Sequence, residues 1–178
     1  MTESPDIEAP LFNFLETNGI QVSTVRHACV FTVSEAQRER GTMPDLFQQG
    51  GHCKSLFVRD KKKRRALVMV DENRRVDLKT LSDKIGLGRL SFGSASSLME
   101  MLGVIPGSVT PFALINAQVA EGKSPPLTVA LDKSMMQQSS LNYHPLHNAA
   151  TTAITPDDLL KFIRACGYEP QIVDLDCE

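Results

Sequence analysis

The sequence lacks the patterns that identify several large classes of protein. No run approaches the ~20 apolar residues that a membrane-spanning helix needs, and the N-terminal segment is acidic, with no apolar stretch. The four cysteines, Cys29, Cys53, Cys166 and Cys177, are scattered and form no C-x-x-C pair. We therefore expect neither secretion nor membrane insertion, but reduced thiols in a cytoplasmic protein.

The signatures of common catalytic and nucleotide sites are also missing. There is no G-x-S-x-G elbow, no P-loop, no H-E-x-x-H and no G-x-G-x-x-G after a predicted strand. Two spacings resemble those of metal ligands, His52–Cys53 and His144-x-x-His147, but a structural zinc site usually has two tight ligand pairs. We therefore predict no metal and no cofactor. A nucleophilic Cys29 beside a nearby histidine is the weaker alternative, because the sequence indicates no orienting third group.

The charge that is present is divided unevenly. The chain has 178 residues, 42% of them hydrophobic, which predicts one domain with a sizeable core over residues 1–178. Its net charge is only −2, yet residues 51–92 hold 12 basic and 5 acidic side chains. That segment carries +7 and the remainder −9. A basic segment favours contact with phosphates, although a solvated hairpin turn explains it equally well.

Strands and helices follow one another without a regular βαβ rhythm, which predicts an α+β fold with a mixed sheet. Helices are indicated by apolar spacing and by end signals such as Ser4 and Thr155. The expected helices cover residues 5–18, 77–85, 94–102 and 156–166, with a brief one beginning at Ser34. The expected strands cover residues 21–27, 55–59, 66–70, 89–92, 111–116, 127–131, 141–144, 150–154 and 171–175.

Three segments carry polar groups that suit a binding site. Lys54 begins a predicted strand, where a lysine is usually a solvated edge residue but can also offer its ammonium to a phosphate or ester oxygen. The loop 103–112 contains two glycines and two prolines, with Ser108 and Thr110 beside them. Such a loop is either a plain connection or a source of backbone amides for an oxyanion. The segment 142–152 gathers two histidines, two amides and two hydroxyls, which suit a ribose or a base edge.

Together these segments resemble the free-standing aminoacyl-tRNA editing domains related to the insertion domain of bacterial prolyl-tRNA synthetase, a group that includes the YbaK proteins. Within it the chain is most similar to the ProX-type alanyl-tRNA(Pro) deacylases. The resemblance covers nearly the whole chain. It rests on the order of these pieces: Val25-Arg26-His27, Val30-Phe31-Thr32-Val33-Ser34-Glu35-Ala36, Lys54-Ser55-Leu56-Phe57, Arg89-Leu90-Ser91-Phe92, Gly103 to Phe112, Tyr143-His144-Pro145-Leu146 and Asn148-Ala149-Ala150-Thr151-Thr152.

The resemblance implies a fold and an activity. The fold would be a single domain with a mixed, curved central β-sheet surrounded by helices. The activity would be hydrolysis of the ester that joins alanine to the terminal adenosine of tRNA for proline. Carried over by motif, Lys54 matches the strand-entry lysine associated with the 3′-terminal nucleotide, and Gly107 and Pro111 match the G-x-x-x-P loop. His144 matches the histidine of the His-Pro-Leu segment, so Lys54, Gly107 and His144 are the expected catalytic residues.

The same resemblance implies a pocket that admits alanine and excludes proline by size. The expected substrate-binding residues are Val30, Phe31, Ser55, Leu56, Ser108, Thr110, Pro111, Phe112 and Asn148. Two positions depart from the family, because Ser55 stands where many relatives have Asn and Ala149 where many have Thr. The first departure puts fine substrate choice in doubt. Lys61, Lys62, Lys63, Arg64 and Arg65 are the expected contacts to tRNA phosphates.

The sequence leaves alternatives open. The substrate could instead be a tRNA misacylated with cysteine or serine, which is still an ester hydrolysis. A different class is a non-catalytic module that binds tRNA or prolyl-tRNA synthetase, since the basic segment fits binding as well as catalysis. The expected partner is tRNA(Pro) charged with alanine, with prolyl-tRNA synthetase as a possible second one, and no membrane or DNA.

Overall fold

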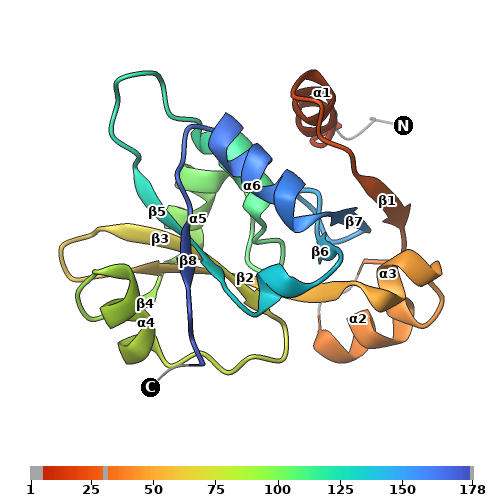
Figure 1. Cartoon of the computed structure of the whole chain (residues 1–178), viewed down its shortest axis with the longest axis horizontal. Coiled ribbons are helices and arrows are strands. Elements are labelled where there is room, and N and C mark those ends of the chain that lie inside the picture. The colour runs from red at the N-terminus through yellow and green to blue at the C-terminus, as the bar shows by residue number, and fades with distance from the viewer. Residues whose placement is uncertain (1–5, 30–31, 177–178) are drawn as a thin grey trace.

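The computed structural model describes residues 6–29 and 32–176, apart from the side chain of Val33. One mixed sheet runs through this part of the chain in the order β1-β7-β6-β2-β3-β5-β8, with β4 added to β2 (Figure 1). Pairing is antiparallel for β1/β7, β6/β7, β2/β3 and β2/β4, and parallel for β2/β6, β3/β5 and β5/β8. The predicted mixed sheet is therefore confirmed. The strands are β1 (Ser23–Arg26), β2 (Gly51–Arg59), β3 (Arg65–Asp71), β4 (Ser91–Phe92), β5 (Leu127–Asp132), β6 (Leu141–Tyr143), β7 (Ala150–Ile154) and β8 (Gln171–Val173).

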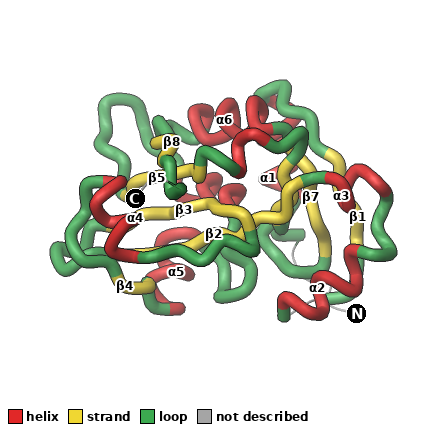
Figure 2. The backbone as a smooth tube through the Cα atoms, turned by 60° about the horizontal axis from the view of Figure 1, so that its bottom comes forward, coloured by secondary structure: helices red, strands yellow, loops and turns green. Residues whose placement is uncertain are grey.

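Helices cover both faces of this sheet, as Figures 1 and 2 show from two directions. The α-helices are α1 (Ala9–Thr17), α2 (Val33–Arg40), α3 (Asp45–Gln49), α4 (Leu78–Ile85), α5 (Ala95–Leu102) and α6 (Pro156–Ala165). Two 3₁₀ helices, η1 (Pro111–Ala117) and η2 (Met135–Gln137), lie in the second half of the chain. None of the helices in the described ranges is long and apolar enough to cross a bilayer.

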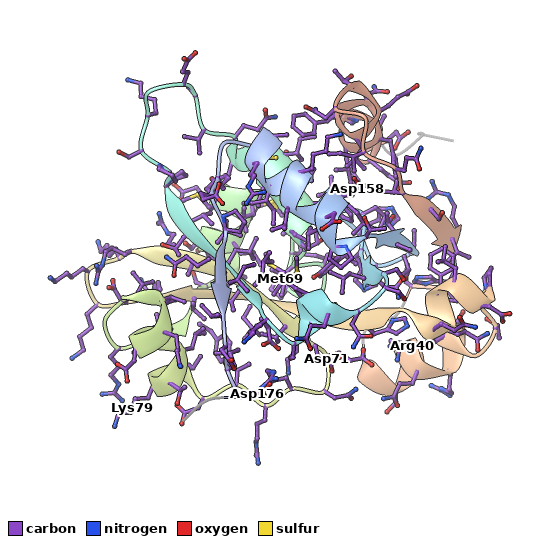
Figure 3. The ribbon with its side chains drawn as sticks, in the orientation of Figure 1. Arg40, Met69, Asp71, Lys79, Asp158 and Asp176 are labelled. Carbon is purple, nitrogen blue, oxygen red and sulfur yellow. The ribbon has the colours of Figure 1, made fainter. Side chains whose placement is uncertain are left out.

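The larger core lies between the sheet and α1, α5, α6 and η1. Met69 of β3 is fully buried at its centre (Figure 3), and Phe112 of η1 packs edge-on against Phe162 of α6 with ring centroids 5.5 Å apart. Alternate residues of the same strands point to the other face, because side chains alternate along a strand. There Val68 of β3 packs with Leu81 of α4 in a second, smaller core.

Local signals explain most helix ends. The Asp77 side chain accepts hydrogen bonds from two amides of the first turn of α4, and Thr155 accepts one from the amide of Asp158 in α6. Gly86 and Gly103 follow α4 and α5 with φ of 72° and 67°, the left-handed conformation that glycine adopts without strain. The brief helix expected at Ser34 begins one residue earlier, and Ser4 lies outside the described residues.

One predicted element is wrong, and two short helices, α3 and η2, were not predicted. Residues 111–116, expected to form a strand, are the 3₁₀ helix η1, because Thr110 caps it by accepting a hydrogen bond from the Phe112 amide (3.3 Å) and Pro111 suits its first turn. A short apolar run fits a buried strand or a buried helix equally well. The helix α3 was not predicted, since its five residues are too few to show a helical period.

Candidate functional site

A cavity of about 80 Å³ lies where β2, β6 and β7 meet helix α2. That volume holds only a few water-sized groups, so an occupant must be small. Figure 3 labels Arg40 of α2, which stands at the side of this cavity. Most of the residues that line the cavity have polar or charged side chains, and three of the four histidines of the chain are among them. The lining residues are His27, Ala36, Glu39, Arg40, Met43, His52, Cys53, Glu72, Val109, Asn142, Tyr143, His144 and Thr151.

Two histidines face each other across the β1/β7 pair. The ring centroids of His27 and His144 are 6.2 Å apart. Nδ1 of His27 donates to the carbonyl of Ala28 (2.8 Å), which leaves Nε2 to accept from the hydroxyl of Thr151 (2.8 Å) in the neutral ring. Nδ1 of His144 donates to the carbonyl of Ala150 (2.8 Å). In its neutral form His144 therefore has Nε2 available as an acceptor.

The protonation of His144 follows from its surroundings. Burial lowers the pKa of His144 below 6.5, and the nearby His27 and His147 lower it further, while the hydrogen bond to Ala150 opposes them. At neutral pH His144 is thus an uncharged imidazole, which can accept a proton from a ligand or from a water molecule.

An ion pair closes the opposite side of the cavity. Arg40 of α2 binds Glu72 in a bidentate arrangement, with nitrogen–oxygen distances of 2.8 and 2.9 Å. Burial, and then the charge of Arg40, lowers the pKa of His52, whose Nε2 donates to the carbonyl of Phe47 (2.6 Å). The Asn142 side chain donates to the same carbonyl (3.2 Å). These contacts fix the polar floor of the cavity.

Cys53, which lines the cavity, and the buried Cys166 are not reactive nucleophiles. Burial raises the pKa of Cys53 to about 12, and it raises that of Cys166 to about 12 as well. Both thiols therefore stay protonated at neutral pH. Cys29, the weaker candidate from the sequence, is exposed and does not line the cavity.

Lys54 lies on the other face of β2 from this cavity. Its Nζ donates to the carbonyl of Arg74 (2.6 Å) in the loop between β3 and α4. The guanidinium of Arg74 is held in turn by the fully buried Asp132 (2.7 Å), by Ser134 (2.9 Å) and by Asp176 (2.7 Å). The half-buried Lys54 thus anchors this loop through its ammonium group. The structure therefore does not bring Lys54 and His144 together.

The loop 103–112 contributes one residue to the cavity lining. Val109 lines the cavity, between Gly107 and Pro111. Gly107 has a φ of 91° and open space around it, so its backbone is accessible. Ser108, Thr110, Pro111 and Phe112 are buried, and Phe112 belongs to the larger core.

The other predicted substrate-binding residues lie outside the cavity lining. The hydroxyl of Ser55 is buried and has no hydrogen-bond partner among the described residues. Leu56 packs against the smaller core, and Asn148 lies in the turn between β6 and β7. Val30 and Phe31 lie outside the described residues.

The sequence reasoning missed several cavity residues. His27 stood in a quoted motif without a role, and His52 was considered only in a metal-like spacing. Asn142 and Thr151 lay in the polar segment 142–152 but were not assigned to the pocket, and no local pattern marked Arg40. Their proximity depends on pairings across the chain, since β1 pairs with β7 more than a hundred residues away. In residues 6–29 and 32–176, no group of three or more His, Cys, Asp and Glu side chains is arranged to hold a metal ion.

The basic hairpin joins β2 and β3 at the far end of β2. Asp60 braces the turn: its carboxylate accepts from Arg64 Nε (2.8 Å), from the Arg64 amide and from the Gly88 amide. Burial would raise the pKa of Asp60, but these hydrogen bonds outweigh it and lower the pKa. Lys61, Lys62 and Lys63 are exposed and form no ion pair with the described residues. The hairpin thus presents three free ammonium groups on a fixed turn.

The mixed sheet with its small cavity is compatible with the aminoacyl-tRNA editing domains, and comparison with known proteins shows this class. The chain belongs to this family, because the model of the aminoacyl-tRNA editing domain matches residues 27–162. It is 34% identical over 157 residues to the prolyl-tRNA editing protein ProX of Acetoanaerobium sticklandii, covering 88% of this chain and 90% of that one.

Further relatives agree with this placement. The chain is 32% identical over 177 residues to the mouse prolyl-tRNA synthetase associated domain-containing protein 1, covering 96% of this chain and 98% of that one. A crystal structure described as a candidate trans-editing enzyme for prolyl-tRNA synthetase shares the fold, with a TM-score of 0.68 and 24% identity over 96% of this chain and 98% of that one. The family is therefore that of the aminoacyl-tRNA editing domains, and its members include a prolyl-tRNA editing protein.

Proposed function

We propose that this protein is a trans-editing hydrolase that deacylates alanine mischarged on tRNA(Pro), cleaving the ester at the 3′-terminal adenosine. The observation that carries the proposal is the small cavity with the uncharged imidazole of His144 in its wall. Editing requires a pocket that discriminates by size, and a cavity of about 80 Å³ suits the methyl group of alanine better than a proline ring.

Ester hydrolysis needs an oriented water molecule and stabilisation of the tetrahedral intermediate, but no protein nucleophile. In the proposed reaction Nε2 of His144 accepts a hydrogen bond from the attacking water or from the ribose hydroxyl that orients it. The accessible backbone at Gly107 supplies an amide near the reacting carbonyl. Both roles use groups with free hydrogen-bonding capacity, which the buried cysteines do not have.

Lys54 has a different proposed role, in which it binds the phosphate of the terminal nucleotide. Lys54 follows Cys53, which lines the cavity, but its side chain points to the other face of the strand. A lysine on a flexible stem can exchange its bond to the Arg74 carbonyl for a phosphate oxygen.

The basic hairpin is proposed to bind phosphates of the acceptor stem. Lys54 and Arg59 are five residues apart on β2, or about 17 Å along the strand. Lys61, Lys62 and Lys63 lie beyond that point, where the stem would extend from a terminal adenosine bound at the cavity.

The decisive experiment compares tRNA(Pro) charged with alanine, tRNA charged with cysteine and tRNA charged with serine, each incubated with the purified protein. We expect selective release of alanine, and we expect Lys54→Ala to slow it by more than about tenfold. Selective release of cysteine or serine would change the substrate while keeping the reaction. Binding of tRNA at low salt without release of any amino acid would replace the enzyme by a non-catalytic module.

A further inference from the structure

The turn that carries His144 has an unusual backbone. Residues 144–149 join β6 to β7, and Leu146 within them has a φ of 76°. A residue with a side chain such as leucine rarely adopts this left-handed conformation, because it strains the backbone. Leu146 is nevertheless buried, at 8% exposure, and packs in the larger core. Contacts elsewhere in the structure must therefore hold this turn in place.

One such contact comes from the start of α1. Glu8, the residue before α1, has a carboxylate that is only 9% exposed. Its Oε1 binds Arg26 of β1 (2.6 Å), and its Oε2 lies 3.2 Å from Nε2 of His147 in the turn. Nδ1 of His147 accepts from the amide of Ala149 (3.1 Å), so Nε2 carries the proton in the neutral ring. The 3.2 Å contact between this nitrogen and Oε2 of Glu8 lies outside hydrogen-bond geometry, so the attraction between the two groups is electrostatic.

The turn is joined to two of the three cavity histidines, His27 and His144. The carbonyl of Ala149 accepts from the amide of His27 (3.1 Å), and the carbonyl of Ala150 accepts from Nδ1 of His144 (2.8 Å). A displacement of residues 147–150 would therefore move the hydrogen-bond partner that orients His144. Figure 1 shows α1 above β1 and β7, from where Glu8 reaches this turn.

We propose that Glu8 and His147 are positioning residues, whose contact anchors the turn 144–149 and thereby fixes the imidazole of His144 in the cavity. This inference rests on the proposed role of His144 in deacylation. The groups near His147 are Glu8, the residue before α1, Arg26 of β1 through its contact with Glu8, and the imidazole of His144. Glu8 is the single carboxylate among them, so its charge is the anchor.

The first test needs no substrate. The chain has four histidines, so the imidazole NMR spectrum has four signals, which single substitutions assign. In the native protein we expect His144 to titrate below pH 6.5, and in Glu8→Gln we expect its midpoint to rise toward 6.5 as the turn loosens and the ring is hydrated. If the turn kept its position, loss of the negative charge of Glu8 would lower the titration midpoint of His144 instead, because a nearby carboxylate favours the protonated imidazole. An unchanged or lowered midpoint would therefore overturn the proposal.

The second test uses deacylation of alanine from tRNA(Pro). We expect kcat to fall roughly tenfold in Glu8→Gln and in His147→Gln, with KM changed by less than about twofold, because a misplaced group lowers the rate more than binding. Glu8→Asp keeps the charge and should recover part of kcat. Glu169→Gln, which removes an exposed partner of Arg164, is the matched control and should change neither quantity.

The two tests separate this proposal from the proposed function. If the native protein releases no amino acid but the His144 midpoint rises in Glu8→Gln, the positioning stands and the deacylase assignment fails. If the native protein deacylates and both variants keep its kcat, the positioning is wrong. Should Glu8→Gln fail to fold by circular dichroism, His147→Gln decides, since the side chain of His147 is partly exposed and tolerates the change.

Discussion

Replacement of Asp132 by Asn gives the sharpest test of how the loop beneath Lys54 is held. Asp132 is fully buried, and its Oδ2 lies 2.7 Å from Nε of Arg74, whose side chain is 18% exposed. The same oxygen accepts from the hydroxyl of Ser134 (2.9 Å). The hydrogen bond with Asp176, and then the charges of Asp132 and Asp176, raise the pKa of Arg74 despite its burial. Asn keeps the shape of the side chain but removes the charge.

The size of the effect follows from burial. Removing one partner of a buried ion pair costs about 3–5 kcal/mol, because the other charge is left without compensation. Here Arg74 keeps Asp176, which is largely exposed, and keeps some contact with water, so we expect about 2–3 kcal/mol. For a chain of this length that corresponds to a fall in Tm of roughly 4–12 °C.

The measurement is guanidinium unfolding followed by far-UV circular dichroism, since the chain has no tryptophan for fluorescence. Glu169→Gln is the control, because it breaks the Arg164–Glu169 pair, both partners of which are exposed, and should leave stability unchanged. A loss below about 1 kcal/mol for Asp132→Asn would refute the reasoning, as the pair would then be as weak as a surface contact.

Three further results are expected. Because burial lowers the pKa of His144 below the 6.5 of the unfolded chain, its contribution to stability is complete above pH 6.5 and is lost as the pH falls through the folded pKa. Melting from pH 5 to 8 should show this dependence, and His144→Gln should reduce it without abolishing it, because burial also lowers the pKa of His52. Iodoacetamide at pH 8 should label Cys29 in the folded protein, whereas Cys53, with a pKa of about 12, should react only after unfolding, as mass spectrometry of the peptides would show. In thermal melts Gly107→Ala should lower the free energy of unfolding by only the ~1–2 kcal/mol that a positive φ costs. Gly167→Ala should lower it more, because the new Cβ would also lie 2.8 Å from the Val119 carbonyl oxygen. Equal losses of stability would contradict this.

The sequence was sufficient for the elements whose signals are local. Thr155 followed by Pro156 and two acids predicted the start of α6, and Gly103 predicted the end of α5. The strand predicted at residues 111–116 was wrong because this short apolar run shows neither a helical nor a strand periodicity. Its 3₁₀ conformation is selected by the burial of Phe112 beneath α6.

The site was less predictable because its geometry comes from pairings between distant segments. The motif around His144 could be found by resemblance, but nothing in the sequence indicated that Thr151 would hold His27, or that Lys54 would bond to the Arg74 carbonyl. The latter contact depends on Asp132, far along the chain, which fixes Arg74. Such partners depend on the register of the paired strands, and the pattern of residues in one strand does not reveal which residue of another strand will lie opposite.

The pairing of β2 explains how residues on opposite faces of one strand can serve a single proposed substrate. β2 pairs with β6 only at Gly51 and His52, and with β4 only at Val58 and Arg59, so the stretch between them has a free edge on that side in the described part of the chain. At this gap Cys53 turns into the cavity beside Val109, while Lys54 turns to the opposite face. An ester in the cavity would extend past the free edge of β2, and its phosphate would meet the ammonium of Lys54 on the far side.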